Sequence, residues 1–131
     1  MVTDPIADSL TRIRNAQMVN KEYVDLLYSK MIEGIIQIMK ENGFIKNFKV
    51  AAEGKNSYIR VYLKYDSNKN PVINEIKRVS KPGLRKYISA KNIRPYKNGI
   101  GIRILTTSKG IITDKDAKKQ NIGGEIICEI W

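Results

Sequence analysis

Histidine is absent from this chain of 131 residues, and Cys128 is its single cysteine. An intramolecular disulfide therefore cannot form, and neither the usual zinc ligand sets nor a histidine-activated nucleophile can be assembled. We expect no metal, no cofactor and no enzymatic activity, and we expect Cys128 to behave as a small hydrophobic side chain of the core. No apolar run approaches the ~20 residues of a membrane-spanning helix, and the acidic N-terminal residues do not resemble a signal peptide. These absences predict a cytoplasmic protein without a membrane partner.

Positive charge is abundant and concentrated in one segment. The chain has 24 Lys and Arg against 13 Asp and Glu, a net charge of +11. Residues 77–119 hold 13 of the basic side chains and two of the acidic ones, so this segment carries the whole excess. Solubility alone does not require such segregation, and the basic residues do not follow one amphipathic helix as a membrane-surface segment would. The pattern is typical of a nucleic-acid-binding surface.

The first half of the sequence predicts two helices and three strands. Asp4 and Pro5 suit the start of a helix that runs toward Asn20, and Ser29 suits the N-cap of a second helix that Asn42-Gly43 ends. Strands are expected over residues 23–27, 44–51 and 57–65. The polar stretch 66–71 is the best candidate for a linker between two modules.

The second half predicts short strands and one short helix. Strands are expected over residues 72–79, 84–88, 99–105, 111–112 and 125–131, with a helix after Thr113 that ends near Gln120. Alternation places Ile100, Ile102 and Ile104 on one face of their strand and Ile126, Cys128 and Ile130 on one face of another. The predicted fold class is α+β, with an N-terminal α-β-α-β-β module over 1–67 and a C-terminal, mostly antiparallel β module over 68–131.

Polar groups suited to nucleic acid occur within and beside the basic segment. Thr106-Thr107-Ser108-Lys109-Gly110 places three hydroxyls and a cation at a predicted strand end, although such a sequence also suits a simple polar turn. Gly123-Gly124 permits close approach of the backbone to a ligand, or a turn before a strand. Glu125 would accept hydrogen bonds from base amino groups, or it would orient a nearby cation. Tyr87, which follows Arg85 and Lys86, could stack on a base.

Several long motifs resemble one known family. They are DPIADSLTRIRNA at 4–16, RVSKPGLRKY at 78–87, NGIGIRILTTSKGIITDKDAKK at 98–119 and IGGEIICEIW at 122–131. In this order they are similar to the bacterial small-subunit ribosomal protein eight family, over nearly the whole chain. One departure is Thr106, which stands where the family more often has serine.

The resemblance implies a structural constituent of the small ribosomal subunit in the cytoplasm. Such a protein would be a primary binding protein of the central domain of 16S ribosomal RNA, neighboured by other ribosomal proteins, and a translational repressor of a ribosomal-protein messenger in some bacteria. Composition alone leaves a DNA-binding architectural protein and a small enzyme as alternatives. The RNA-binding residues expected in the C-terminal module are Arg85, Lys86, Tyr87, Thr106, Thr107, Ser108, Lys109, Gly123, Gly124 and Glu125. Those expected nearer the N-terminus are Thr3, Asp4, Arg12, Arg14 and Lys30.

Overall fold

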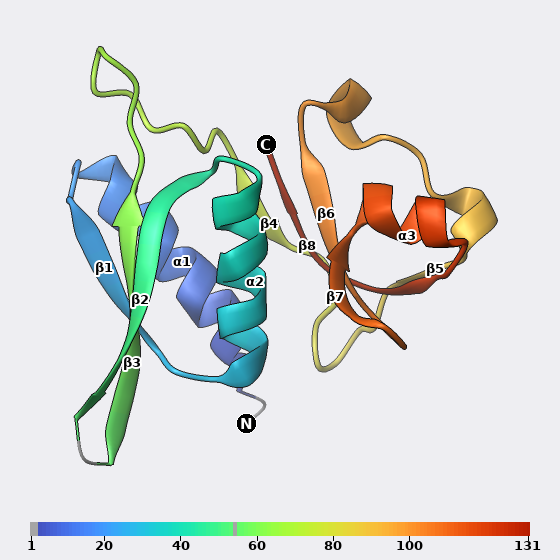
Figure 1. Ribbon diagram of the computed structural model, residues 1–131, viewed down its shortest axis with the longest axis horizontal. Coiled ribbons are helices and arrows are strands. Elements are labelled where there is room, and N and C mark those ends of the chain that lie inside the picture. The colour runs from blue at the N-terminus through green and yellow to red at the C-terminus, as the bar shows by residue number, and fades with distance from the viewer. Residues whose placement is uncertain (1–2, 54) are drawn as a thin grey trace. The chain divides into compact units, whose positions relative to one another are not determined.

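The computed structural model describes residues 3–53 and 55–131 and divides the chain into two compact units (Figure 1). The N-terminal unit is Pro5–Ile73; the C-terminal unit contains Asn74–Trp131 together with Thr3 and Asp4. Both units combine helices with an antiparallel sheet, which confirms the predicted α+β class.

The N-terminal unit is a three-stranded sheet with two helices packed on it. Its sheet has the order β1-β3-β2; α1 packs against β1, and α2 packs against β2 (Figure 1). Ile59, Val61 and Leu63 alternate along β3 and are buried. The elements are α1 (Pro5–Met18), β1 (Tyr23–Leu27), α2 (Lys30–Glu41), β2 (Ile45–Glu53) and β3 (Asn56–Leu63).

Local signals set the ends of α2 as predicted. The Ser29 hydroxyl accepts a hydrogen bond from the Ile32 amide at 3.0 Å, which satisfies one of the unpaired donors of the first turn. Asn42 is the C-cap, and Gly43 follows with a φ of 79°, a left-handed conformation that glycine adopts without a steric penalty. No helix within residues 3–53 and 55–131 is long and apolar enough to cross a membrane.

The C-terminal unit is a five-stranded sheet with one short α-helix. The strand order is β4-β8-β6-β7, and β5 also pairs with β8. The Thr113 side chain accepts a hydrogen bond from the Asp116 amide and caps α3, as the sequence predicts. The elements are β4 (Ile76–Arg78), β5 (Tyr87–Ile88), the 3-10 turns η1 (Ala90–Asn92) and η2 (Tyr96–Gly99), β6 (Ile102–Thr107), β7 (Gly110–Thr113), α3 (Asp114–Gln120) and β8 (Gly124–Ile130).

Two predicted strands are shorter than the sequence suggested. The strand expected over 72–79 is reduced to β4, because the Asn74 and Glu75 amides both donate to the Trp131 carbonyl and leave the ladder pattern. The strand expected over 84–88 is reduced to β5, because Lys81 and Leu84 exchange backbone hydrogen bonds of 3.0 and 2.9 Å across a tight turn.

Two predicted alternation patterns are also wrong in part. Ile100 is 73% exposed and precedes β6, so it does not share a buried face with Ile102 and Ile104. In β8, the register against β6 shifts where Ile104 pairs with Cys128 and Leu105 pairs with Ile126. The extra residue between these pairs is a β-bulge, which puts Ile126 with Leu105 in the cluster under α3 and Cys128 on the other face.

The core assignment of Cys128 is confirmed. Its side chain is fully buried, and desolvation raises the pKa of its thiol to about 12. We expect Cys128→Ala to lower the free energy of unfolding by about 1 kcal/mol through a small cavity. Urea unfolding checks this. The native thiol should also resist a thiol-specific reagent until the protein unfolds, and rapid native-state labelling would contradict the burial.

Candidate nucleic-acid interface

Three predicted site residues from distant parts of the sequence form one row across the C-terminal sheet. Tyr87 of β5 lies directly opposite Glu125 of β8, and Glu125 lies directly opposite Thr106 of β6. Directly paired residues of antiparallel strands project from the same face, so the three side chains are neighbours. Tyr87 is 71% exposed and presents its ring to solvent. The row therefore offers an aromatic surface, a carboxylate and a hydroxyl side by side.

The hydroxyl-rich loop continues from this row, but its hydroxyls differ in role. The Thr107 hydroxyl donates to the Gly110 carbonyl at 2.9 Å and accepts from the Lys109 amide at 3.1 Å, which ties the turn between β6 and β7 together. Gly110 closes the turn with a φ of 97°. Ser108 and Lys109 are exposed at its tip. Thr107 therefore shapes the loop, while Ser108 and Lys109 present their side chains to solvent.

Glu125 acts within the protein as the orienting partner of a cation. Its carboxylate accepts hydrogen bonds from the buried Ser80 hydroxyl and from Arg85, the latter at 3.0 Å. The Ser80 hydroxyl in turn accepts from the Lys86 amide at 3.0 Å. The hydrogen bonds from Ser80 and Arg85 outweigh partial burial and hold the pKa of Glu125 below its ordinary value. Through these contacts an ionised Glu125 holds the basic turn that contains Arg85 and Lys86 next to β8, beside the row.

The paired glycines are explained by strand packing. A Cβ atom on Gly123 would lie 2.4 Å from the Ile88 carbonyl oxygen, and one on Gly124 would lie 2.4 Å from the Thr106 carbonyl oxygen. Both distances are far below van der Waals contact. Glycine is therefore required for β8 to fit between β5 and β6. This requirement is independent of any ligand that approaches the same backbone.

Several cations of the basic segment are engaged within the protein. Arg103 pairs with Glu129 at 2.8 Å, Arg78 pairs with Asp4 at 3.2 Å, and Lys118 donates to the Ala90 carbonyl at 3.3 Å. These contacts organise the C-terminal unit, and their side chains contribute to its core and loops. Exposed cations near the row and loop include Lys86 and Lys109. Which cations are engaged is not predictable from neighbouring residues, because the partners lie far away along the chain.

The predicted residues nearer the N-terminus are divided between the two units. Asp4 belongs with the C-terminal unit and accepts a hydrogen bond from Arg78 through its carboxylate; Thr3 beside it is exposed. Arg12 pairs with Asp8 at 3.0 Å on the solvent side of α1. Arg14 is half-buried on α1, and Lys30 is exposed at the start of α2. Arg12, Arg14 and Lys30 belong to the N-terminal unit.

The chemistry of the row and loop defines a class of protein. Hydroxyls, ammonium groups and an exposed tyrosine ring are the groups that contact phosphates, ribose hydroxyls and unpaired bases. No cluster of three or more histidine, cysteine or acidic residues that could hold a metal exists among the residues described. The surface is thus that of a small α+β binding protein.

Comparison with known proteins gives the family. A family model described as ribosomal protein S8 matches residues 4–131, and the chain belongs to this family. The small ribosomal subunit protein uS8 of Geobacter sulfurreducens is 53% identical over 130 residues, which is 99% of this chain and 98% of the relative. Its counterpart in Desulforudis audaxviator is 52% identical over 131 residues and the full length of both chains. The family resemblance seen in the sequence is confirmed, as is the prediction of a ribosomal protein rather than an enzyme.

Proposed function

We propose that this protein is a primary binding protein of the central domain of 16S ribosomal RNA, acting early in small-subunit assembly in the cytoplasm. A structural role in the small ribosomal subunit, among other ribosomal proteins, follows from the family and from the relatives' names. The observation that carries the finer proposal is the row of Tyr87, Glu125 and Thr106 beside the Thr107–Gly110 loop.

The arrangement assigns a separate task to each group. Lys86 and Lys109 neutralise phosphates, which positions the RNA without reading its sequence. The Ser108 hydroxyl can donate to and accept from a ribose 2′-hydroxyl or a base edge, and the Tyr87 ring can stack on an unpaired base. Glu125 contributes indirectly, by fixing Arg85 and the adjoining turn. Such a surface suits an internal loop of RNA better than a regular duplex.

Nuclease footprinting of a 16S central-domain transcript with the purified protein tests the proposal. Protection should be confined to an internal loop and its flanking helices, and a 2′-deoxy version of the same target should bind much more weakly. A messenger transcript from a ribosomal-protein operon tests the repressor role, because it should compete for the same surface. Binding should also fall with salt, with a log–log slope of roughly −3 to −5 if about four to six phosphates are contacted. A slope near zero, or equal binding to the deoxy target, would rule the proposal out.

Lys109→Glu should weaken binding to this transcript much more than Lys55→Glu, which makes the same charge change in the N-terminal unit. Both lysines are exposed, so each variant should fold like the parent. The reason for the difference is that Lys109 lies in the proposed RNA surface. Parallel filter-binding titrations compare the two variants, and equal losses would place the contact elsewhere.

Ser108→Ala should reduce binding roughly ten- to hundred-fold, since its RNA partner would be left unpaired in a desolvated contact. Thermal stability should change by only a few tenths of a kcal/mol, because Ser108 is exposed in a turn that Thr107 holds. Thr106→Ser, which keeps the hydroxyl, is the matched variant and should bind like the parent. Titration against the isolated RNA loop, paired with melting curves, separates the outcomes. Unchanged binding by Ser108→Ala would show that the loop is only a turn.

A further inference from the structure

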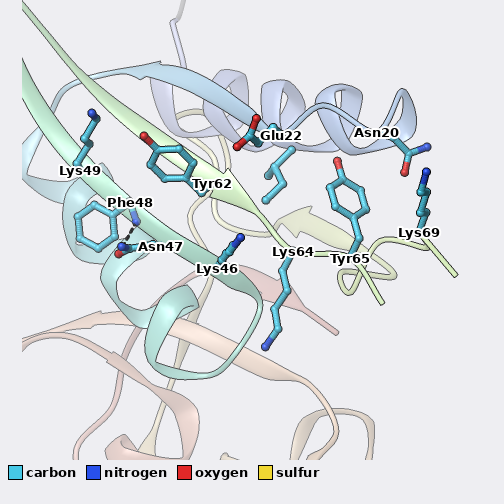
Figure 2. Close-up of a pocket in the computed structure, with 11 residues that line it drawn as sticks. Asn20, Glu22, Lys46, Asn47, Phe48, Lys49, Tyr62, Lys64, Tyr65 and Lys69 are labelled. Carbon is cyan, nitrogen blue, oxygen red and sulfur yellow. Dashed lines mark hydrogen bonds between the residues drawn. The ribbon is translucent and has the colours of Figure 1, made fainter. Parts of the chain in front are cut away.

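A broad groove with a positive lining crosses the N-terminal unit, outside the surface proposed above. It has a volume of about 1190 Å³ and lies along β2, β3 and the segment that follows β3 (Figure 2). Two tyrosines lie among its lysines, and Glu22 contributes a carboxylate to the same lining. The lysines are Lys46, Lys49, Lys64 and Lys69, and the tyrosines are Tyr62 and Tyr65.

A β-bulge brings Lys46 into this groove. The register of β2 against β3 shifts between Ile45, which pairs with Leu63, and Asn47, which pairs with Tyr62. Lys46 is the extra residue of this bulge. In a regular strand its side chain would point away from the face that carries Asn47 and Lys49, and the bulge removes this constraint. The Asn47 side chain accepts a hydrogen bond from the Phe48 amide at 2.8 Å beside this irregularity. Bulges commonly re-aim a side chain at a functional surface.

The turn after β3 presents Lys69 at the other end of the groove. The Asp66 carboxylate accepts hydrogen bonds from the Asn68 and Asn70 amides at 2.8 and 2.9 Å, which closes the turn. Lys69 has a φ of 65°, in the left-handed region that residues other than glycine and asparagine seldom adopt. Its exposed ammonium group is therefore carried on a well-connected turn.

The four lysines differ in what they can offer to a partner. The Lys64 ammonium lies next to Gly43, just beyond the C-terminus of α2, where it complements the helix dipole. Lys46, Lys49 and Lys69 are exposed, and within the described residues no ion pair or hydrogen bond involves their ammonium groups. These three cations are available to an anionic partner.

We infer that this groove binds a short unpaired segment of RNA, with its phosphates on Lys46, Lys49 and Lys69. Single-stranded nucleic acid is bound without sequence preference where a positive groove runs beside aromatic rings on which bases stack. Tyr62 is half-buried beside Tyr23, and the Tyr65 hydroxyl donates to the Lys21 carbonyl at 2.6 Å, so both rings are held in place. An acidic protein segment would need the lysines but not the rings, which is why RNA is the better fit. This groove is separate from the RNA surface of the proposed function, and the inference does not depend on that function.

A labelled decauridylate, which has no stable secondary structure, is the probe. Fluorescence anisotropy at low salt should show that Lys46→Glu/Lys49→Glu in the full chain weakens binding by about tenfold or more and lowers the salt slope by roughly one to one and a half. Lys40→Glu/Lys55→Glu makes the same charge change in the same unit, outside the groove lining, and forms the control. Tyr62→Leu should weaken binding roughly fivefold or more, and Tyr62→Phe should retain it.

The same titrations are repeated in a Lys86→Glu/Lys109→Glu chain, so that binding by the proposed surface of the C-terminal unit is weakened. Persistence of the groove effect in this background supports the inference. It is overturned if decauridylate binding disappears in this background, if the control pair weakens binding equally, or if a decaglutamate peptide binds the groove more tightly than the oligonucleotide. Circular dichroism melting curves confirm that each variant is folded. Because the central-domain transcript is not used, failure here leaves the proposed function untouched.

Discussion

Gly124→Ala should lower the free energy of unfolding by about 3 kcal/mol, a large loss for a single methyl group. The added Cβ would lie 2.4 Å from the Thr106 carbonyl oxygen and 2.8 Å from the Thr107 side chain. Both atoms belong to β6, whose backbone pairs with β8, so relief requires the two strands to move apart. Overpacking of this kind is worst where the obstacle is backbone rather than a flexible side chain. Urea unfolding measures the loss directly.

Gly83→Ala is the control, because a Cβ on Gly83 would meet no atom within 4 Å. Its stability should stay within about 0.5 kcal/mol of the parent. A Gly124→Ala protein that melts like the parent but no longer binds RNA would contradict strand packing as the reason for this glycine. Loss of both properties together would show that binding fails through the fold.

Glu125→Ala should lower the free energy of unfolding by about 1–3 kcal/mol, because it leaves the buried Ser80 hydroxyl without its acceptor and releases Arg85. A double-mutant cycle with Ser80→Ala isolates the interaction. Single losses that simply add in the double variant would show that the two groups are not coupled. RNA binding should weaken as well, since the basic turn would lose its attachment.

The same pair predicts a pH dependence with a definite sign. The folded protein holds the pKa of Glu125 below the ordinary value of 4.5, so the unfolded chain takes up this proton at higher pH than the folded one. The stabilisation is therefore complete above about pH 4.5 and is lost as the pH falls from there through the folded-state pKa. The difference in stability between the parent and Glu125→Gln should shrink over this acidic window. A difference that stays constant or grows as the pH falls would contradict the ion pair.

Helices were predictable because their signals are local. Ser29, Asn42 and Gly43 act within a few residues of the ends they define, and the structure uses them as expected. Strand limits were less predictable because they depend on distant partners. Of the strand expected over 72–79, only β4 forms, because the Asn74 and Glu75 amides donate to the carbonyl of Trp131, which lies far along the chain.

The candidate sites show the same division. The sequence indicated the residues of the Tyr87, Glu125 and Thr106 row, but only strand pairing reveals that they are adjacent. The charge distribution along the sequence does not indicate the lysine groove, because residues outside 77–119 have no net charge. A bulge at Lys46 and a turn at Lys69 gather cations that are far apart in sequence, and no count along the chain detects this.

The position of β8 has a consequence for synthesis. β8 pairs with β4, β5 and β6, and it is translated after all three. Until β8 has emerged, β4 and β5 have no sheet to join, whereas the strands of the N-terminal unit already have one another. Nascent chains generally fold unit by unit in the order of synthesis. The surface built on β5, β8 and β6 is therefore completed only after β8 has been synthesised.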